Sequence, residues 1–272
     1  MKYLKLASGY DMPMVGLGTW TLAGQECTDV VQAALAMGYR HIDTAEGYHN
    51  QVDIGKALRA AGIPREELFI TSKVAPEHLR YEAVLHACEG TLRDLGTPYV
   101  DLYLVHWPNR EVPLAETFRA LNYLQAEGLV RDIGVSNFTI PLVDQALAAS
   151  ENPIAMNQVE YHPYLNQEAL REHCQACGVQ LTAYSPFGRG KLFSEPVIMS
   201  IAERTGRTPG QVIVQWLMHK GIVAIPRSHA VEHVRANFDV FGWELPAEDF
   251  AAIDGIETWQ RLVHGPWIDF ED

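Results

Sequence analysis

The segment DLYLVHW, residues 101–107, is an apolar run of strand length that ends on a histidine and a tryptophan. Seven other segments of this kind occur along the chain, and the stretches between them leave room for one helix each. In chain order the eight segments begin at Val15, His41, Leu68, Asp101, Asp132, Ala155, Val179 and Ile222. Eight strand and helix units in 272 residues favour an α/β fold of the closed (β/α)8 TIM barrel type over a doubly wound sheet.

The segments between the expected strands have the pattern of amphipathic helices. Residues 29–38 and 114–128 carry apolar residues at i, i+3 and i+4 spacing and close on a glycine, the usual residue after a helix end. Thr208-Pro209 is typical of a helix start, where the missing N–H of proline costs little. Before the barrel we expect an N-terminal β-hairpin, with a strand from Tyr3 to Leu6 and a turn at Ser8-Gly9.

Composition narrows the class of protein. The net charge is −13 and we find no basic patch, so nucleic acid is not an expected partner. No apolar run approaches the roughly 20 residues that span a bilayer, and the N-terminus lacks a secretory signal. The four cysteines therefore indicate reduced thiols in a cytoplasmic protein. Because we find no linker or low-complexity stretch, residues 1–272 are expected to form one domain. We also expect the protein to be a monomer.

Polar residues close the expected strands, where barrel enzymes carry their chemistry. Asp43, Lys73 and His106 end three successive strands, and Tyr48 lies on the loop after Asp43. Each residue alone is more often a helix cap or a satisfied core residue, but the four together point to a site. The later strands add Ser136, Asn137, Gln158, Tyr184, Ser185, Arg227 and Ser228.

These residue types suit proton delivery to a carbonyl oxygen. A phenol titrates near 10, and a neighbouring ammonium lowers its pKa, so Lys73 could make Tyr48 a better acid while Asp43 holds Lys73 in place. His106 could donate a hydrogen bond to the same oxygen and orient the carbonyl. Such a site lacks a reductant, so the hydride must come from a cofactor. Gly16 and Gly18 are not followed by glycine at position 21, so a Rossmann fingerprint is absent.

Several motifs in the same order resemble the aldo-keto reductases, in particular their short bacterial members that reduce 2,5-diketo-D-gluconate and methylglyoxal. The matching stretches are GYRHIDTAEGYHNQVDIGKAL (38–58), VDLYLVHWP (100–108), GLVRDIGVSNF (128–138), NQVEYHPYLNQ (157–167), AYSPFGRG (183–190) and IPRSHAVEHVRANF (225–238). The resemblance implies an NADPH-dependent reductase of aldehydes and ketones, with Asp43, Tyr48, Lys73 and His106 as its catalytic tetrad.

The resemblance also implies where NADPH would lie across the barrel mouth. Tyr184 would stack on the nicotinamide, and Ser136, Asn137 and Gln158 would hold its carboxamide. The other expected cofactor contacts are Thr19, Trp20, Ser185, Pro186, Phe187, Gly188, Arg227, Ser228, His233 and Asn237. Where the family commonly has lysine, arginine and glutamate at 227, 233 and 236, this chain has Arg227, His233 and Ala236. The charge at 227 is kept, so NADPH is still expected over NADH, with a weaker preference.

The substrate is less well indicated. Trp20, Trp107 and Trp267, with Tyr48 and His106, are expected to line the substrate pocket, and short loops after His106 and at the C-terminus favour broad use of carbonyls. A non-enzymatic NADPH-binding regulatory subunit is the alternative of another class. Cys174 and Cys177 form a C-x-x-C beside His173 that could have a redox or zinc role. No second ligand pair at metal-site spacing occurs, so a helix surface without metal is the preferred interpretation.

Overall fold

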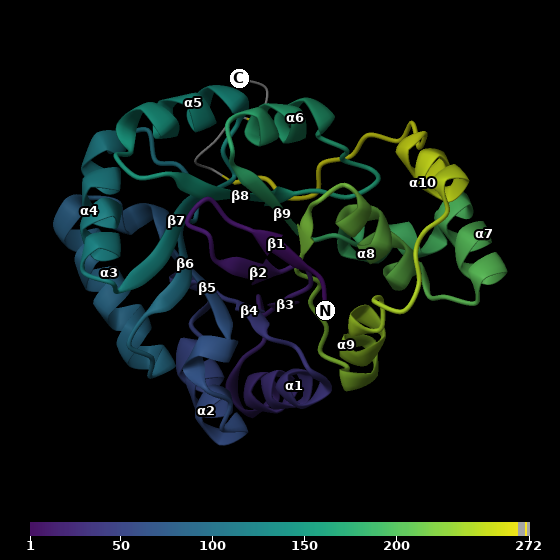
Figure 1. Ribbon diagram of the computed structural model, residues 1–272, viewed down its shortest axis with the longest axis horizontal. Coiled ribbons are helices and arrows are strands. Elements are labelled where there is room, and N and C mark those ends of the chain that lie inside the picture. The colour runs from purple at the N-terminus through teal and green to yellow at the C-terminus, as the bar shows by residue number, and fades with distance from the viewer. Residues whose placement is uncertain (266–269, 271–272) are drawn as a thin grey trace.

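The computed structural model describes residues 1–265 and Phe270, and its centre is a ring of eight parallel strands (Figure 1). The strands are β3 (Leu17–Gly18), β4 (His41–Asp43), β5 (Phe69–Val74), β6 (Val100–Val105), β7 (Val130–Ser136), β8 (Ile154–Glu160), β9 (Gln180–Tyr184) and β10 (Val223–Ala224). Neighbours in the ring follow chain order, and a parallel bridge between Val15 and Ala224 joins its first and last strands. The predicted barrel is confirmed.

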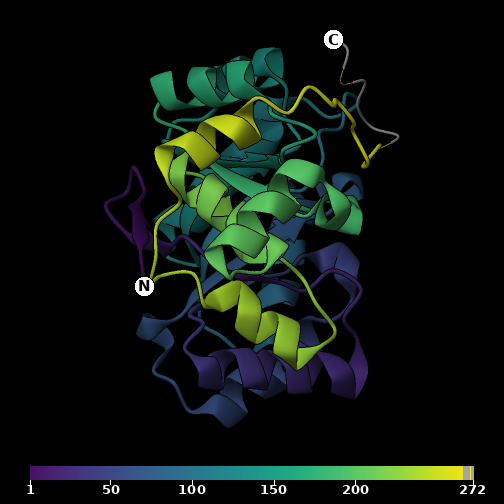
Figure 2. The ribbon, with the colours of Figure 1, turned by 90° about the vertical axis from the view of Figure 1, so that its right-hand side faces the viewer.

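Helices surround the ring, as Figures 1 and 2 show. They are α1 (Gly24–Met37), α2 (Gln51–Ala61), α3 (Tyr81–Leu95), α4 (Leu114–Ala126), α5 (Ile140–Ala149), α6 (Glu168–Ala176), α7 (Pro196–Thr205), α8 (Pro209–His219), α9 (Val231–Phe238) and α10 (Ala247–Asp254). Among the described residues, none of these helices combines the length and the apolar character needed to cross a bilayer.

The helix boundaries follow the sequence signals where those signals are local. Helix α1 ends at Gly38, whose φ of 108° is in the left-handed region, and α8 begins with a capping box between Thr208 and Gln211. The start of α1 differs from the expectation, because the helix begins at Gly24 rather than residue 29. The Gly24 N–H donates to the carboxylate of Asp53 in α2 at 2.8 Å, so a side chain from another helix caps this first turn.

The N-terminal hairpin covers one end of the barrel. Strands β1 (Tyr3–Lys5) and β2 (Asp11–Pro13) pair antiparallel, as expected. Leu6 and Met12 are buried in one cluster with Phe69 and Leu102, which lie at or near the starts of their strands. This apolar plug fills the end of the barrel where the strands begin and leaves the opposite end, where they finish, for polar side chains.

Helices α2 and α3 approach each other at Gly55. A Cβ at this position would lie 2.6 Å from the carbonyl oxygen of Asp94 and 2.7 Å from that of Leu95, at the end of α3. These are backbone atoms, so they cannot rotate away from an added methyl group. The contact therefore requires glycine for reasons of space.

Replacing Gly55 with alanine should lower the free energy of unfolding by about 1–3 kcal/mol, the usual cost of overpacking. A denaturant titration measures the loss. Gly242→Ala is the matched control, because nothing lies within 4 Å of the position that a Cβ would take there. We expect the control to stay within about 0.5 kcal/mol of the parent chain. Equal stability of the two variants would contradict the close approach of α2 and α3.

Candidate active site

A cavity of about 1460 Å³ opens where the barrel strands finish. Most of the residues that the sequence analysis selected line it: Thr19, Trp20, Asp43, Tyr48, His106, Trp107, Ser136, Asn137, Gln158, Tyr184, Ser185, Pro186, Phe187, Arg227, Ser228, His233 and Asn237. Lys73 and Gly188 are not part of the lining, and both are buried. Trp267 lies outside the described residues, so the expectation for its role is not tested.

Asp43, which lines the cavity, forms a buried ion pair with Lys73 behind it. The Lys73 Nζ donates to Asp43 Oδ1 at 2.6 Å and to the carbonyl oxygen of Thr44 at 2.8 Å. The other carboxylate oxygen of Asp43 accepts a 2.7 Å hydrogen bond from Gln158 Nε2. Both charged side chains are almost completely buried, and the hydrogen bonds offset the cost of taking them out of water. The expected pairing of Lys73 with Asp43 is thus present.

Tyr48 and His106 lie next to each other above this pair. Tyr48 ends the short 3₁₀ helix η1 (Glu46–Tyr48), which follows β4, whereas His106 directly follows β6. Their ring centroids are 5.5 Å apart in an edge-to-face arrangement, and the Lys73 Nζ lies 5.1 Å from the centroid of the Tyr48 ring. Tyr48, His106 and Lys73, which come from three separate segments of the chain, therefore lie next to one another.

The pKa of Tyr48 differs from the sequence expectation. Burial, with a smaller contribution from the Asp43 charge, raises the pKa of Tyr48 well above its ordinary value instead of lowering it. The reason is that a buried phenolate loses its hydration, and the ammonium of Lys73, which is paired with Asp43, does not outweigh that loss. The phenol therefore keeps its proton over the whole physiological pH range.

His106 is neutral for a related reason. Burial and the charge of Lys73 lower the pKa of His106 to about 3. Its imidazole therefore has one N–H donor and one acceptor nitrogen at neutral pH. Two uncharged hydrogen-bonding groups, a phenol and an imidazole, face the same part of the cavity.

Amide and hydroxyl groups at the ends of β7, β8 and β9 are joined by hydrogen bonds in the lining of the cavity. The Tyr184 hydroxyl donates to Asn137 Oδ1 at 2.7 Å, and the Asn137 amide donates to the carbonyl oxygen of His106 at 2.9 Å. The Ser136 hydroxyl donates to the carbonyl oxygen of Gln158 at 2.7 Å. Asn137 has a φ of 64°, a conformation that few residues other than glycine adopt and that is often found at functional sites.

Two cationic side chains, those of Arg189 and Arg227, also line the cavity. Arg227 has a lowered pKa, first because it is partly buried and second because the Arg189 guanidinium is nearby. Arg189 also lies 5.6 Å from the Trp20 ring, and within the described part of the chain neither arginine has a carboxylate partner in an ion pair. The sequence analysis did not select Arg189, which lies in the GRG stretch after the selected loop.

Glu160 is a second residue that the sequence analysis missed. It is fully buried at the end of β8, where its carboxylate accepts hydrogen bonds from the backbone N–H groups of Leu262 and Val263, each at 2.9 Å. The His162 Nε2 also lies 2.9 Å from it. Glu160 thus fixes the C-terminal segment over the barrel, and that segment adds Val263 and His264 to the cavity lining. A glutamate at a strand end, in NQVEY, was the available signal.

The comparisons with known proteins agree with this geometry. The profile of the Aldo/keto reductase family matches residues 14–258. Glyoxal reductase of Bacillus subtilis is 41% identical over 264 residues, which cover 97% of this chain and 95% of the relative. An aldo-keto reductase of Mycolicibacterium smegmatis is 40% identical, with 97% and 96% covered.

Solved structures give the same result for the fold. An aldo-keto reductase from a deep-sea metagenome library of the Medee basin superposes with a TM-score of 0.94 at 37% identity, covering 96% of this chain and 97% of that one. The aldose reductase of Schistosoma japonicum gives 0.92 at 34% identity, with 97% and 94% covered. The barrel, the cavity and these matches over nearly the whole length show that the chain belongs to the aldo/keto reductase family.

Proposed function

We propose that this chain reduces aldehydes and ketones with NADPH, and that Tyr48 gives the proton. One observation carries the proposal: the cavity that is lined by Tyr48 and His106 is also lined by two arginines, Arg189 and Arg227. A carbonyl and a phosphate group could therefore be bound at once. We further propose that the chain acts as a single-domain monomer in the cytoplasm.

The residues fit an elongated dinucleotide. A volume of about 1460 Å³ exceeds the roughly 300–1,000 Å³ usual for one small ligand, as a cofactor with a substrate beside it requires. The guanidinium of Arg227 matches a phosphate monoester in charge and in planar hydrogen-bonding geometry. In the same cavity, Asn137 and Gln158 offer amide groups that suit a nicotinamide carboxamide. Tyr184 offers an aromatic ring that suits the nicotinamide ring.

When bound, the reduced nicotinamide supplies the hydride for the carbonyl carbon. The Tyr48 hydroxyl is protonated before the reaction, because its raised pKa keeps the phenol neutral. As negative charge develops on the carbonyl oxygen, that oxygen becomes a stronger base than a phenolate, and the proton moves from the Tyr48 hydroxyl to it. Lys73, held by Asp43, then stabilises the phenolate that remains.

His106 orients the carbonyl in this scheme. Its neutral imidazole donates a hydrogen bond to the carbonyl oxygen, so that the oxygen faces Tyr48. A protonated His106 would compete as an acid, and its lowered pKa prevents this at neutral pH.

We propose methylglyoxal, 2,5-diketo-D-gluconate-like sugars and aromatic aldehydes as substrates. Two relatives support this choice: the glyoxal reductase of Bacillus subtilis and a structure described as a putative 2,5-diketo-D-gluconic acid reductase B, 35% identical with a TM-score of 0.92. The test follows the loss of NADPH absorbance with each carbonyl in turn. Tight NADPH binding without turnover of any of them would instead favour the regulatory-subunit alternative.

Tyr48→Phe should lower kcat by roughly 10²–10⁴ and leave NADPH affinity unchanged, because the variant loses only the proton donor. Steady-state kinetics with methylglyoxal and NADPH-dependent quenching of tryptophan fluorescence measure the two quantities. Tyr123→Phe, at an exposed position of α4, is the matched control and should keep full activity. A loss of less than about tenfold in Tyr48→Phe would remove Tyr48 from this role.

The pH profile tests the neutral state of His106. An imidazole of ordinary pKa would lose about nine-tenths of its neutral form between pH 7.5 and 5.5. Because the pKa of His106 is lowered to about 3, the neutral form persists over this range, and kcat/KM for 4-nitrobenzaldehyde at saturating NADPH should stay level. An acid limb with a midpoint near 6.5 that disappears in His106→Gln would show that the imidazole titrates normally.

Arg227→Ala should weaken NADPH binding by roughly 10–100-fold and change NADH binding little, because only NADPH carries the 2′-phosphate. Dissociation constants for both cofactors give the comparison. Arg235→Ala is the control, since Arg235 is an exposed arginine on α9 that does not line the cavity. Equal losses for the two cofactors would place Arg227 on a group that they share.

A further inference from the structure

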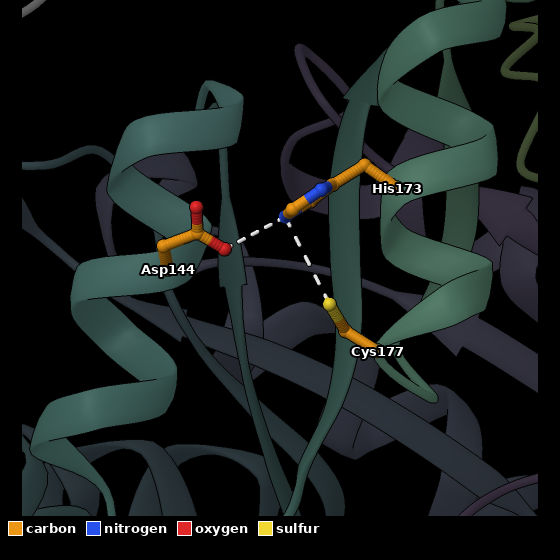
Figure 3. A group of neighbouring side chains, drawn as sticks. All are labelled: Asp144, His173 and Cys177. Carbon is orange, nitrogen blue, oxygen red and sulfur yellow. Dashed lines mark hydrogen bonds and ion pairs between the residues drawn. The ribbon is translucent and has the colours of Figure 1, made fainter.

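Three side chains with metal-binding atoms meet between helices α5 and α6 (Figure 3). They are Asp144 of α5, His173 of α6 and Cys177, which caps the end of α6. Their ligand atoms all lie within 4.8 Å of one another, and the three residues are exposed or half-buried. None of them lines the cavity described above, so this cluster is independent of the proposed reductase site.

The cluster converges on one nitrogen of the imidazole. Asp144 Oδ1 lies 2.7 Å from His173 Nε2, and Cys177 Sγ lies 3.8 Å from the same nitrogen. A relay that activates a thiol nucleophile needs the carboxylate and the thiol on opposite nitrogens of the ring. Two acceptors on a single nitrogen do not suit such a relay. They suit a cation placed between the three groups.

Two of the three ligand distances can be compared with those of a tetrahedral zinc site, and the third, from sulfur to oxygen, is at most 4.8 Å. Zn–S and Zn–N bonds of ordinary length put a thiolate sulfur and an imidazole nitrogen roughly 3.6 Å apart, and a nitrogen and a carboxylate oxygen roughly 3.4 Å apart. The sulfur is thus already 3.8 Å from Nε2. The distance from the Asp144 oxygen to Nε2 would have to grow from 2.7 Å by about 0.7 Å, which a side chain that is 56% exposed can do.

Local structure holds two of the ligands in register. His173 and Cys177 are four residues apart, so they share one face of α6, and the Cys177 N–H donates to the carbonyl oxygen of His173 at 3.1 Å. The neighbouring Cys174 is fully buried. The C-x-x-C motif therefore does not act as a pair: one sulfur faces the barrel core and the other joins a histidine and an aspartate that is distant in sequence.

We propose that Asp144, His173 and Cys177 bind one Zn²⁺ ion, which joins α5 to α6 and keeps a fourth position for water. A thiolate, an imidazole and a carboxylate together favour zinc over magnesium or calcium, which prefer sets of oxygen ligands. The spacing of cysteines and histidines in the sequence favoured a helix surface without metal. Asp144 was not considered there, because it lies 29 residues before His173, in a different helix. Zinc held by two helices stabilises the folded chain, which alone presents the three ligands together.

Cobalt is the probe for the first experiment, since Co²⁺ enters zinc sites and absorbs visible light. The full chain, kept reduced by a phosphine, is titrated with Co²⁺ and then with Zn²⁺. We expect one equivalent of Co²⁺ to produce tetrahedral d–d bands and a thiolate-to-cobalt charge-transfer band, both removed by Zn²⁺. Binding without a thiolate band would overturn the proposal, because histidines elsewhere would then account for it.

Variants assign the ligands. Loss of residues that only support a metal ligand costs about 10–100-fold in affinity, so His173→Gln and Cys177→Ser should each weaken Zn²⁺ binding at least tenfold. Cys177→Ser should also abolish the thiolate band. His86→Gln is the matched control: His86 is exposed and lies 3.5 Å from Glu89, a histidine and carboxylate pair without a thiol. Unchanged affinity in His173→Gln, or a thiolate band that survives in Cys177→Ser, would refute the site.

Thermal unfolding gives a second readout that does not depend on spectra. Zn²⁺ at a concentration that saturates the parent chain should raise the melting temperatures of the parent chain and of His86→Gln equally, and that of Cys177→Ser by clearly less. Without metal, the parent chain, His86→Gln and Cys177→Ser should melt together, because both substituted side chains are exposed. An equal rise in all of them would mean that the metal acts at another place.

Discussion

The buried pair of Asp43 and Lys73 is the constraint on which the site depends. A charge without a partner in a protein core is strongly destabilising, so both groups must be fully hydrogen-bonded. Asp43 does this with Lys73 on one oxygen and Gln158 on the other, and thereby connects β4, β5 and β8 across the barrel. The main chain of Asp43 also accepts from the N–H and the hydroxyl of Thr19. One carboxylate residue thus fixes the floor of the cavity.

The electrostatics of the cavity follow from this pair. Burial is the largest cause of the pKa shifts of Tyr48 and His106, the charge of Asp43 adds to the first and that of Lys73 to the second, and both side chains are uncharged. Positive charge in the same cavity comes from Arg189 and Arg227. In a chain of net charge −13, these two arginines suit the anionic cofactor that we propose.

The barrel explains why much of the site could be found in the sequence. Parallel strands in a closed ring all finish at the same end, so a residue's place at a strand end is enough to locate it. Asp43, Lys73 and His106 were selected on that ground alone, and they lie together. Glu160 and Arg189 were not selected, because their roles depend on segments distant in the chain: the C-terminal residues that Glu160 holds, and Trp20 beside Arg189.

The sequence by itself determined the alternation of strands and helices, the capped ends of α1 and α8, and the residue types at the barrel mouth, since each depends on local pattern. Only the tertiary structure decided the start of α1, which depends on Asp53, and the separation of Cys174 from Cys177. It also decided the direction of the Tyr48 pKa. These features depend on burial and on contacts between residues that are distant in the sequence, and local sequence patterns do not specify either.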